Sequence, residues 1–398
     1  MGCVAALALA RGGASVLLLE GNATAAQRLA GEWLHPRGAR ILRELGLELP
    51  GEPGCGFALF PEDGGPAVLL PYEGEAGLSC EHEALVSVLR QAAAGADGVT
   101  FLPATRVLGI DGTRLELESG DVLAGRIVGT DGRASLVRRS AGISGAGTTV
   151  SAMAGVVLEG AELPFEGFGH VLLGGPGPVL VYRLGPGRLR ACIDVPGRTP
   201  RPRDAARTLW EGYGHAFPPQ LGPAFREALE SGTIAWAANR FRRRTKEARF
   251  GTGGLVLAGD AAGYYHPLTA VGMTLGFADA LGAATLAPAD YRRRRAQASR
   301  APELLATALY AAFTRKDGGT AALRRAMVAM WADPGERRRT MRLLSTDEER
   351  TAAFYRSFAK VVALTAEEAL RRRRPGSLDG FGWWLRWLTV GRLGHQAG

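Results

Sequence analysis

The stretch that decides the fold is MGCVAALALARGGASVLLLEGN, residues 1–22. Residues 3–11 are small and apolar, as in a helix packed against a sheet, and Gly12 and Gly13 mark its end. The following ASVLLLE predicts a buried parallel strand that ends in an acid, Glu20. A helix, a glycine turn, an apolar strand and a terminal acid form the second half of a Rossmann βαβ unit. In that unit the acid accepts hydrogen bonds from a ribose.

Gly2 fits the last glycine of the G-x-G-x-x-G fingerprint of that unit, which lets the helix and strand pack closely. The first strand and the other two glycines of the fingerprint are not in the sequence. We therefore expect the true start to lie upstream of Met1, and the longer chain to bind its dinucleotide more tightly. Taken alone, this stretch also fits an ordinary surface helix and strand.

A second segment, LAGRIVGTDGRASLVRRSAGI (123–143), predicts a strand, a short turn at Asp131 and Gly132, and a helix. A glycine in such a turn lets the backbone approach a ligand closely. Alone, the pattern is weak, and an ordinary strand–helix turn is the favoured interpretation.

A third segment, GGLVLAGDAAGYYHPLTAVGMTLGFADAL (253–281), is more specific. Its buried strand delivers Asp260 at the carboxyl end, where open α/β sheets bind ligands. A loop through His266 then leads past Gly272 into a helix whose N-terminus stabilises negative charge. The alternatives are a helix-capping role for Asp260 and a packing or capping role for His266.

Composition excludes several classes of protein. The chain has 398 residues, 46% of them apolar, and a formal net charge of +9. It has no run of 18 apolar residues, so a spanning helix is not predicted. The arginines are scattered without an aromatic–basic motif, which argues against nucleic acid. Four widely spaced cysteines predict neither a metal site nor a disulfide framework, and favour the cytoplasm.

Residues 27–47, QRLAGEWLHPRGARILRELGL, follow the ribose acid and add a longer motif. Together with the loop that contains GDA, HPLT and GMT, they make the chain resemble the squalene monooxygenase (squalene epoxidase) family of FAD-dependent enzymes. The first motif matches the family at Arg28, Gly31, Glu32, Leu34, Pro36, Gly38, Leu45, Gly46 and Leu47. The loop matches at Gly259, Asp260, Ala261, His266, Pro267, Leu268, Thr269, Gly272, Met273 and Thr274. Ala84 and Tyr265 stand where the family has arginine, and Ala270 and Val271 where it has glycine.

The resemblance implies an α/β fold, α+β overall, in which a Rossmann-type FAD-binding domain is interleaved with a β-sheet substrate domain and followed by C-terminal helices. The expected FAD-binding parts are 1–50, 79–150 and 250–290, the substrate sheet 51–78 and 151–249, and the helical region 291–398.

The resemblance also implies roles for individual residues. The cofactor-binding set is Gly2, Glu20, Arg28, Glu32, Asp131, Gly259, Asp260, Pro267, Gly272 and Met273. In it, Glu20 would bind the adenosine ribose, Asp260 would contact the ribityl-pyrophosphate portion, and Gly272 and Met273 would face the flavin ring.

Tyr265 and His266, with Tyr264 beside them, are the candidates for the catalytic pocket edge, and a packing role is the alternative. No metal is expected.

The implied function is epoxidation or hydroxylation of an apolar, terpenoid or squalene-like alkene through a flavin C4a-hydroperoxide. FAD would be the cofactor, O2 the co-substrate and NAD(P)H the electron source, directly or through a flavoprotein reductase. An FAD-dependent isoprenoid double-bond reductase and a non-catalytic lipid-binding protein are the alternatives.

The C-terminal stretch LRRRRPGSLDGFGWWLRWLTVGRLG sets four arginines before Phe381, Trp383, Trp384 and Trp387. Arginine and tryptophan in this arrangement suit a membrane interface. We therefore expect a cytoplasmic protein with peripheral contact to the cytoplasmic face of a membrane. A helix packed across the substrate mouth is the alternative.

Overall fold

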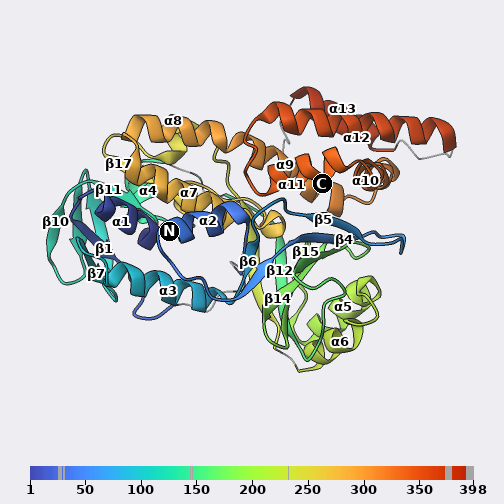
Figure 1. Ribbon diagram of the computed structural model, residues 1–398, viewed down its shortest axis with the longest axis horizontal. Coiled ribbons are helices and arrows are strands. Elements are labelled where there is room, and N and C mark those ends of the chain that lie inside the picture. The colour runs from blue at the N-terminus through green and yellow to red at the C-terminus, as the bar shows by residue number, and fades with distance from the viewer. Residues whose placement is uncertain are drawn as a thin grey trace.

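A computed structural model describes residues 1–25, 29, 32–143, 145, 147–231, 233–372 and 379–390. It confirms the mixed α/β class. Figure 1 shows a half with short parallel strands on the left, a large antiparallel sheet at the lower right and a layer of C-terminal helices above that sheet.

The left half contains the two parallel strand pairs. Strand β1 pairs with β7, and β11 pairs with β17. Helix α1 packs against β1, β7 and β11 and also against α7, so it joins the two pairs. The elements are α1 (Gly2–Arg11), β1 (Val16–Leu19), α2 (Pro36–Glu44), α3 (His82–Ala94), β7 (Val99–Leu102), β11 (Ile127–Gly129), α4 (Leu136–Ser140), β17 (Leu255–Leu257) and α7 (Gly272–Thr285).

Strand β1 departs from the expectation of a buried strand. Leu17 is 42% exposed, and the other residues of β1 are partly buried. The reason is that no described strand pairs with the second edge of β1, nor with the second edge of β11. The residues of both strands line the same cavity instead.

The antiparallel sheet has seven strands in the order β16-β12-β15-β14-β13-β4-β5, and all neighbouring strands in it pair antiparallel except β13 and β4, which are parallel. Side chains alternate across it, as the two-residue period of a strand requires. In β14, for example, Val179 and Val181 face the helices α5 and α6, whereas Leu180 and Tyr182 face the other side. The bounds are β4 (Gly56–Phe60), β5 (Val68–Pro71), β12 (Thr148–Glu159), β13 (Phe168–Leu172), β14 (Val179–Gly185), β15 (Arg188–Pro196), β16 (Ala235–Phe241), α5 (Pro202–Tyr213) and α6 (Gly222–Glu230).

Two smaller sheets complete the strands. One pairs the two short strands that flank α2 with the strand directly before α3, and the other comes directly before β11 in the sequence. They comprise β2 (Trp33–Leu34), β3 (Glu52–Gly54) and β6 (Gly77–Ser79), and β8 (Val107–Asp111), β9 (Arg114–Leu117) and β10 (Val122–Ala124).

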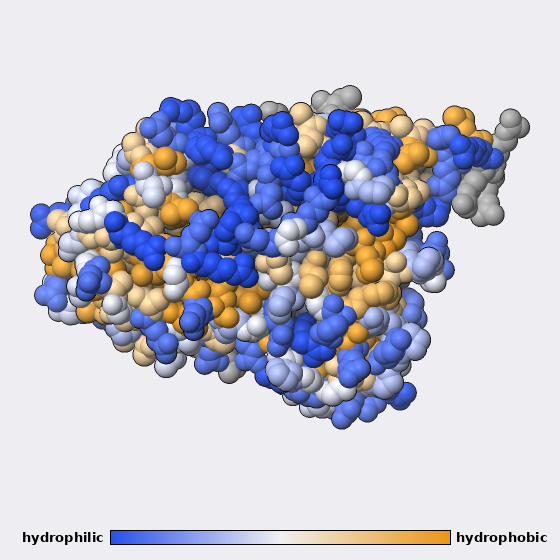
Figure 2. Space-filling view, viewed as in Figure 1, coloured by the Kyte–Doolittle hydropathy of each residue, from blue (hydrophilic) through white to orange (hydrophobic). Residues whose placement is uncertain are grey.

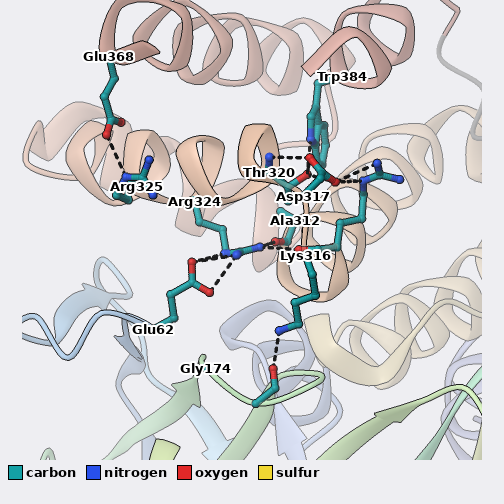
Figure 3. A network of polar contacts seen from close by, with 12 residues as sticks. Glu62, Gly174, Ala312, Lys316, Asp317, Thr320, Arg324, Arg325, Glu368 and Trp384 are labelled. Atoms are coloured by element: carbon teal, nitrogen blue, oxygen red, sulfur yellow. Dashed lines mark hydrogen bonds and ion pairs between the residues drawn. The ribbon is translucent and has the colours of Figure 1, made fainter. Parts of the chain in front are cut away.

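The C-terminal helices cover the inner face of the antiparallel sheet and share one apolar core with it. Figure 3 shows the polar joint between them, in which Arg324 of α10 reaches Glu62 beside β4. The helices are α8 (Pro288–Ala298), α9 (Arg300–Thr314), α10 (Gly318–Met330), α11 (Pro334–Leu344), α12 (Thr351–Arg372) and α13 (Phe381–Val390).

The aromatic residues of α13 mostly point inward. Phe381, Trp384 and Trp387 are buried, with the rings of Trp384 and Trp387 near Phe358 of α12. They therefore pack in the core rather than forming an outward aromatic face. Within the described residues, no helix is both long and apolar enough to cross a membrane.

Candidate active site

One cavity of about 1550 Å³ runs from the ends of the parallel strands to the inner face of the antiparallel sheet. Pockets for drug-sized ligands occupy roughly 300–1,000 Å³, so this space can hold a larger ligand or two ligands together. Its walls include residues of the three segments that the sequence singles out, at 1–22, 123–143 and 253–281. Figure 2 shows apolar residues among hydrophilic ones on the half of the molecule that contains these strands.

The polar end of the cavity begins at α1. Met1, Gly2 and Cys3 line it, and no side chain caps the N-terminus of this ten-residue helix. A Cβ on Gly2 would lie 3.0 Å from Leu18 Cδ1 and 3.0 Å from Thr130 Oγ1, so glycine allows α1 to approach both strand ends. Free amides at a helix N-terminus attract anions such as phosphate.

Glu20 lies in the cavity wall directly after β1. Its Oε1 accepts hydrogen bonds from the backbone N–H of Asn22 at 2.9 Å and from Asn22 Nδ2 at 3.0 Å. Its Oε2 lies 3.3 Å from Arg90 Nη2 of α3. These contacts hold a charged acceptor beside α1.

Asp131 and Asp260 follow neighbouring strands, because β11 and β17 pair in parallel and end side by side. The two carboxylates have different surroundings. Asp131 accepts from the Ser135 hydroxyl at 2.5 Å and from the amides of Leu136 at 2.6 Å and Val137 at 3.1 Å, which fixes the start of α4. Asp260 has an ion pair with Arg133 at 3.2 Å and lines the cavity. Both carboxylates line the cavity, and Asp260 accepts fewer hydrogen bonds from the protein than Asp131 does.

Gly272 and Met273 begin α7, and with Pro267 they line the cavity. No side chain caps the N-terminus of α7 either. Gly259 adopts a φ of +63° in the turn before Asp260, and its amide donates to Asp279 Oδ2 at 2.9 Å. The buried Asp279 carboxylate therefore fixes this turn.

Asp279, which does not line the cavity but supports the turn before Asp260, is a residue that the sequence patterns did not indicate. It is fully buried on α7, pairs with Arg244, and its Oδ1 lies 2.7 Å from Arg295 Nε. The available signal was an acid within the apolar helix sequence GFADAL, since buried acids are almost always paired.

Glu32 lies at the apolar end of the cavity, 3% exposed. Its carboxylate accepts hydrogen bonds from Arg190 Nε at 3.0 Å and Nη2 at 2.9 Å, and from the Tyr182 hydroxyl at 2.8 Å. Arg190 and Tyr182 belong to β15 and β14, so this contact joins residues far apart in the sequence. Trp33, Met153, Leu180 and Trp236 are among the apolar side chains that line this end of the cavity.

His266 connects the loop before α7 to the antiparallel sheet. Its Nδ1 accepts the amide N–H of Leu268 at 3.2 Å, and its Nε2 lies 2.9 Å from Asp194 Oδ1. Because Nδ1 is an acceptor, Nε2 carries the proton and donates it to Asp194. Asn239 also donates to Asp194 Oδ1, at 2.9 Å. The ring is 5% exposed and stacks on Tyr310. Its hydrogen bonds therefore hold the imidazole in one position.

A second histidine, His35, holds the same loop from the other side. Trp33 Nε1 donates to the Tyr72 hydroxyl at 3.1 Å, and that hydroxyl donates to His35 Nδ1 at 2.6 Å. His35 Nε2 then donates to the carbonyl of Thr269 at 2.8 Å. Burial lowers the pKa of His35 to about 4, so the ring is neutral near pH 7.

The remaining candidates lie as follows. Tyr264 lines the cavity under the Arg133 guanidinium, 5.3 Å from its ring centre. Tyr265 lines it as well, but its hydroxyl donates to the Ser299 carbonyl at 3.1 Å and burial raises its pKa. Arg28 and Gly31 lie outside the described residues.

Comparison with known proteins places this architecture in a family. A model of the squalene epoxidase family matches residues 124–375. Squalene epoxidase 3 of Arabidopsis thaliana is 31% identical over 299 residues, which cover 70% of this chain and 56% of that protein. Squalene monooxygenase of Rattus norvegicus is 28% identical over 306 residues, covering 70% and 51%. The chain thus spans about half the length of these relatives.

Solved structures share the fold. PqsL, a probable FAD-dependent monooxygenase of Pseudomonas aeruginosa, gives a TM-score of 0.65 at 20% identity and covers 78% of this chain and 93% of its own. The Diels-Alderase PyrE3 gives 0.64 at 17% identity, covering 86% and 78%. A shared fold therefore does not decide the reaction. The match of the family model over more than half of the sequence decides the kinship: the chain belongs to the squalene epoxidase family.

Proposed function

We propose that this chain binds FAD and an apolar, terpenoid or squalene-like alkene in one cavity, and that it epoxidises or hydroxylates the alkene with O2. The observation that carries the proposal is the continuity of the cavity. It joins two uncapped helix N-termini and the carboxylates of Glu20 and Asp260 to a wall of apolar side chains.

The polar end fits a dinucleotide such as FAD. The first amides of α1 would hold the pyrophosphate, and Glu20 would accept hydrogen bonds from the adenosine ribose. Asp260 would contact the ribityl-pyrophosphate portion. The N-terminus of α7, with Gly272 and Met273, would stabilise negative charge on the flavin ring. When bound, FAD supplies the redox chemistry that activates O2.

The protein's remaining tasks are to orient the alkene and to exclude water. The apolar wall near Trp33 and Trp236 would orient the alkene and exclude water, because apolar side chains bind an apolar substrate and do not bind water. We assign His266 and His35 positioning roles, since each fixes one side of the loop at 267–269 by hydrogen bonds. Tyr264 and Tyr265 belong to the edge of the same pocket.

The test is reconstitution of the chain with FAD, NADPH, a flavoprotein reductase and squalene as the probe alkene. The expected result is O2 uptake matched by an epoxide or alcohol one oxygen heavier than the substrate. A product with two added hydrogens and no O2 uptake would instead identify an isoprenoid reductase. Absence of a flavin spectrum after reconstitution would favour a non-catalytic lipid-binding protein.

The FAD site can be tested separately. Asp260→Ala should weaken FAD binding, measured by quenching of flavin fluorescence, because the substitution removes a carboxylate from the cavity wall. Asp290→Ala is the matched control, since Asp290 is 57% exposed on α8 and outside the cavity. Equal FAD affinity of the two variants would argue against a role for Asp260.

We also propose peripheral contact with the cytoplasmic face of a membrane, through the outer side of α12 and α13. Leu370 is 74% exposed and Leu385 is 46% exposed. Pelleting with anionic liposomes should fall on adding salt and in the Leu370→Asp/Leu385→Asp variant. No pelleting of the wild-type chain at low salt would refute this contact.

A further inference from the structure

A second cavity, of about 410 Å³, lies between α11 and the first turns of α12. Five arginines line it together with a single acid. Its complete lining is Gly335, Arg338, Arg339, Arg342, Glu348, Arg350, Ala352, Ala353 and Arg356. It shares no residue with the candidate active site. We call it the arginine cavity.

Three of these arginines already have acidic partners. Arg350 forms a forked pair with Glu348, at 3.0 Å from Nε and 2.6 Å from Nη2. Arg339 Nη1 lies 2.5 Å from Glu336 Oε2, and Arg338 pairs with Glu73. These pairs offset much of the local charge and fix the walls.

The other two arginines, Arg342 and Arg356, are exposed and have neither an ion pair nor a side-chain hydrogen bond within the described ranges. Two guanidinium groups thus line the arginine cavity without a carboxylate of the described residues within ion-pair distance. The guanidinium fork matches the oxygens of a phosphate group in shape and charge. The first turn of α12, which supplies Ala352 and Ala353, adds the positive end of a helix dipole.

We propose that the arginine cavity binds a phosphate group, with Arg342 and Arg356 as the direct ligands and the paired arginines as the surrounding wall. The phosphate can belong to a lipid headgroup or to a small soluble molecule, and the cavity recognises the chemistry that they share. Figure 2 shows hydrophilic residues gathered over the C-terminal helices on the upper part of the molecule, the layer that contains α11 and α12.

The experiment compares the wild-type chain with Arg342→Gln/Arg356→Gln and with a matched control, Arg198→Gln/Arg201→Gln. The control removes the same charge just before α5, from two exposed arginines that have no ion pair in the described structure and line neither cavity. Inorganic phosphate and pyrophosphate are titrated by calorimetry at constant ionic strength. Vesicles of phosphatidylcholine with and without a phosphoinositide are tested by co-sedimentation.

We expect the wild-type chain and the control to bind at least one probe, and the cavity variant to bind it roughly tenfold more weakly for each arginine removed. Binding of the soluble anions identifies a small-molecule phosphate. Binding of the phosphoinositide vesicles alone identifies a lipid headgroup. The proposal is overturned if the wild-type chain binds none of the probes, or if the cavity variant binds as well as the control. Thermal unfolding of all three proteins verifies that the variants are folded.

Discussion

At the scale of single residues, the site depends on buried polar groups whose partners come from distant parts of the chain. Glu32 and Arg190 are separated by 158 residues in sequence and form a forked pair in the cavity wall. The resemblance gave Glu32 a place near the cofactor, and the structure places it in the cavity. Nothing local to Arg190 or Tyr182 predicts that they hold it, because contacts between strands and loops depend on the tertiary fold.

Glu32→Gln should destabilise the fold strongly. The substitution leaves Arg190 charged and largely buried without its carboxylate, and breaking a buried ion pair in this way costs about 3–5 kcal/mol. Urea unfolding measures the change in free energy. Glu166→Gln is the control, because Glu166 pairs with Arg183 but is 57% exposed, and such a pair contributes about 0–1 kcal/mol. Similar losses in both variants would contradict the burial argument.

Two buried histidines make stability depend on pH. Burial lowers the pKa of His35 and of His170 from 6.5 to about 4. Below about pH 6.5 the unfolded chain takes up protons that the folded chain does not, so stability falls as the pH drops from there towards 4. At about pH 5 each histidine should reduce stability by about 2 kcal/mol.

The measurement is the urea unfolding free energy at about pH 7 and about pH 5. His35→Gln should show a smaller drop than the wild type, and His215→Gln, which alters an exposed histidine, should show the wild-type drop. An unchanged drop in His35→Gln would mean that the buried ring already takes up a proton in the folded state.

At the scale of elements, local sequence patterns predicted the secondary structure well where it depends on residues that are close together in the sequence. Residues 3–11 predicted a helix, and α1 spans Gly2–Arg11. The turn at Asp131 lies between β11 and α4, as its sequence indicated. The expected burial of β1 was wrong, because burial depends on which strand lies beside it. Likewise, the burial of Phe381, Trp384 and Trp387 depends on α12, which no pattern within the C-terminal stretch specifies.

Gly38 lies where α2 packs closely against α7, so a substitution there tests how close this packing is. A Cβ on Gly38 would lie 2.4 Å from Leu34 Cδ1 and 2.8 Å from Thr274 Oγ1, both buried. Gly38→Ala should therefore lower the melting temperature, at a cost of about 1–3 kcal/mol for overpacking. Gly382→Ala in α13 is the matched control. A Cβ there meets nothing within 4 Å, so alanine should be neutral or add up to about 1 kcal/mol. Tolerance of both substitutions would show that α2 can move away from α7.

At the scale of the whole molecule, the C-terminal helices pack on the antiparallel sheet, which contributes Met153, Leu180 and Tyr182 to the wall of the cavity. Much of their contact is an apolar core, which is held by the non-directional burial of apolar surface. Arg324 provides the directional contact in Figure 3. It lies 2.8–2.9 Å from the Glu62 carboxylate oxygens and donates to the carbonyls of Ala312 at 2.7 Å and Arg315 at 2.9 Å.

Arg324→Gln should therefore loosen the helical layer from the sheet. Arg324 is 5% exposed but Glu62 is 31% exposed, so the loss should be about 1–3 kcal/mol, from the carbonyls of Ala312 and Arg315 and the Glu62 carboxylate left without their donor. The neighbouring Arg325→Gln breaks the more exposed pair with Glu368 and should cost no more than about 1 kcal/mol. Limited proteolysis can show which part of the structure loses stability. Cleavage between α9 and α13 should accelerate in Arg324→Gln and stay at the wild-type rate in Arg325→Gln. If cleavage accelerates equally in both, the apolar core alone holds the layers together and the polar joint adds nothing to their alignment.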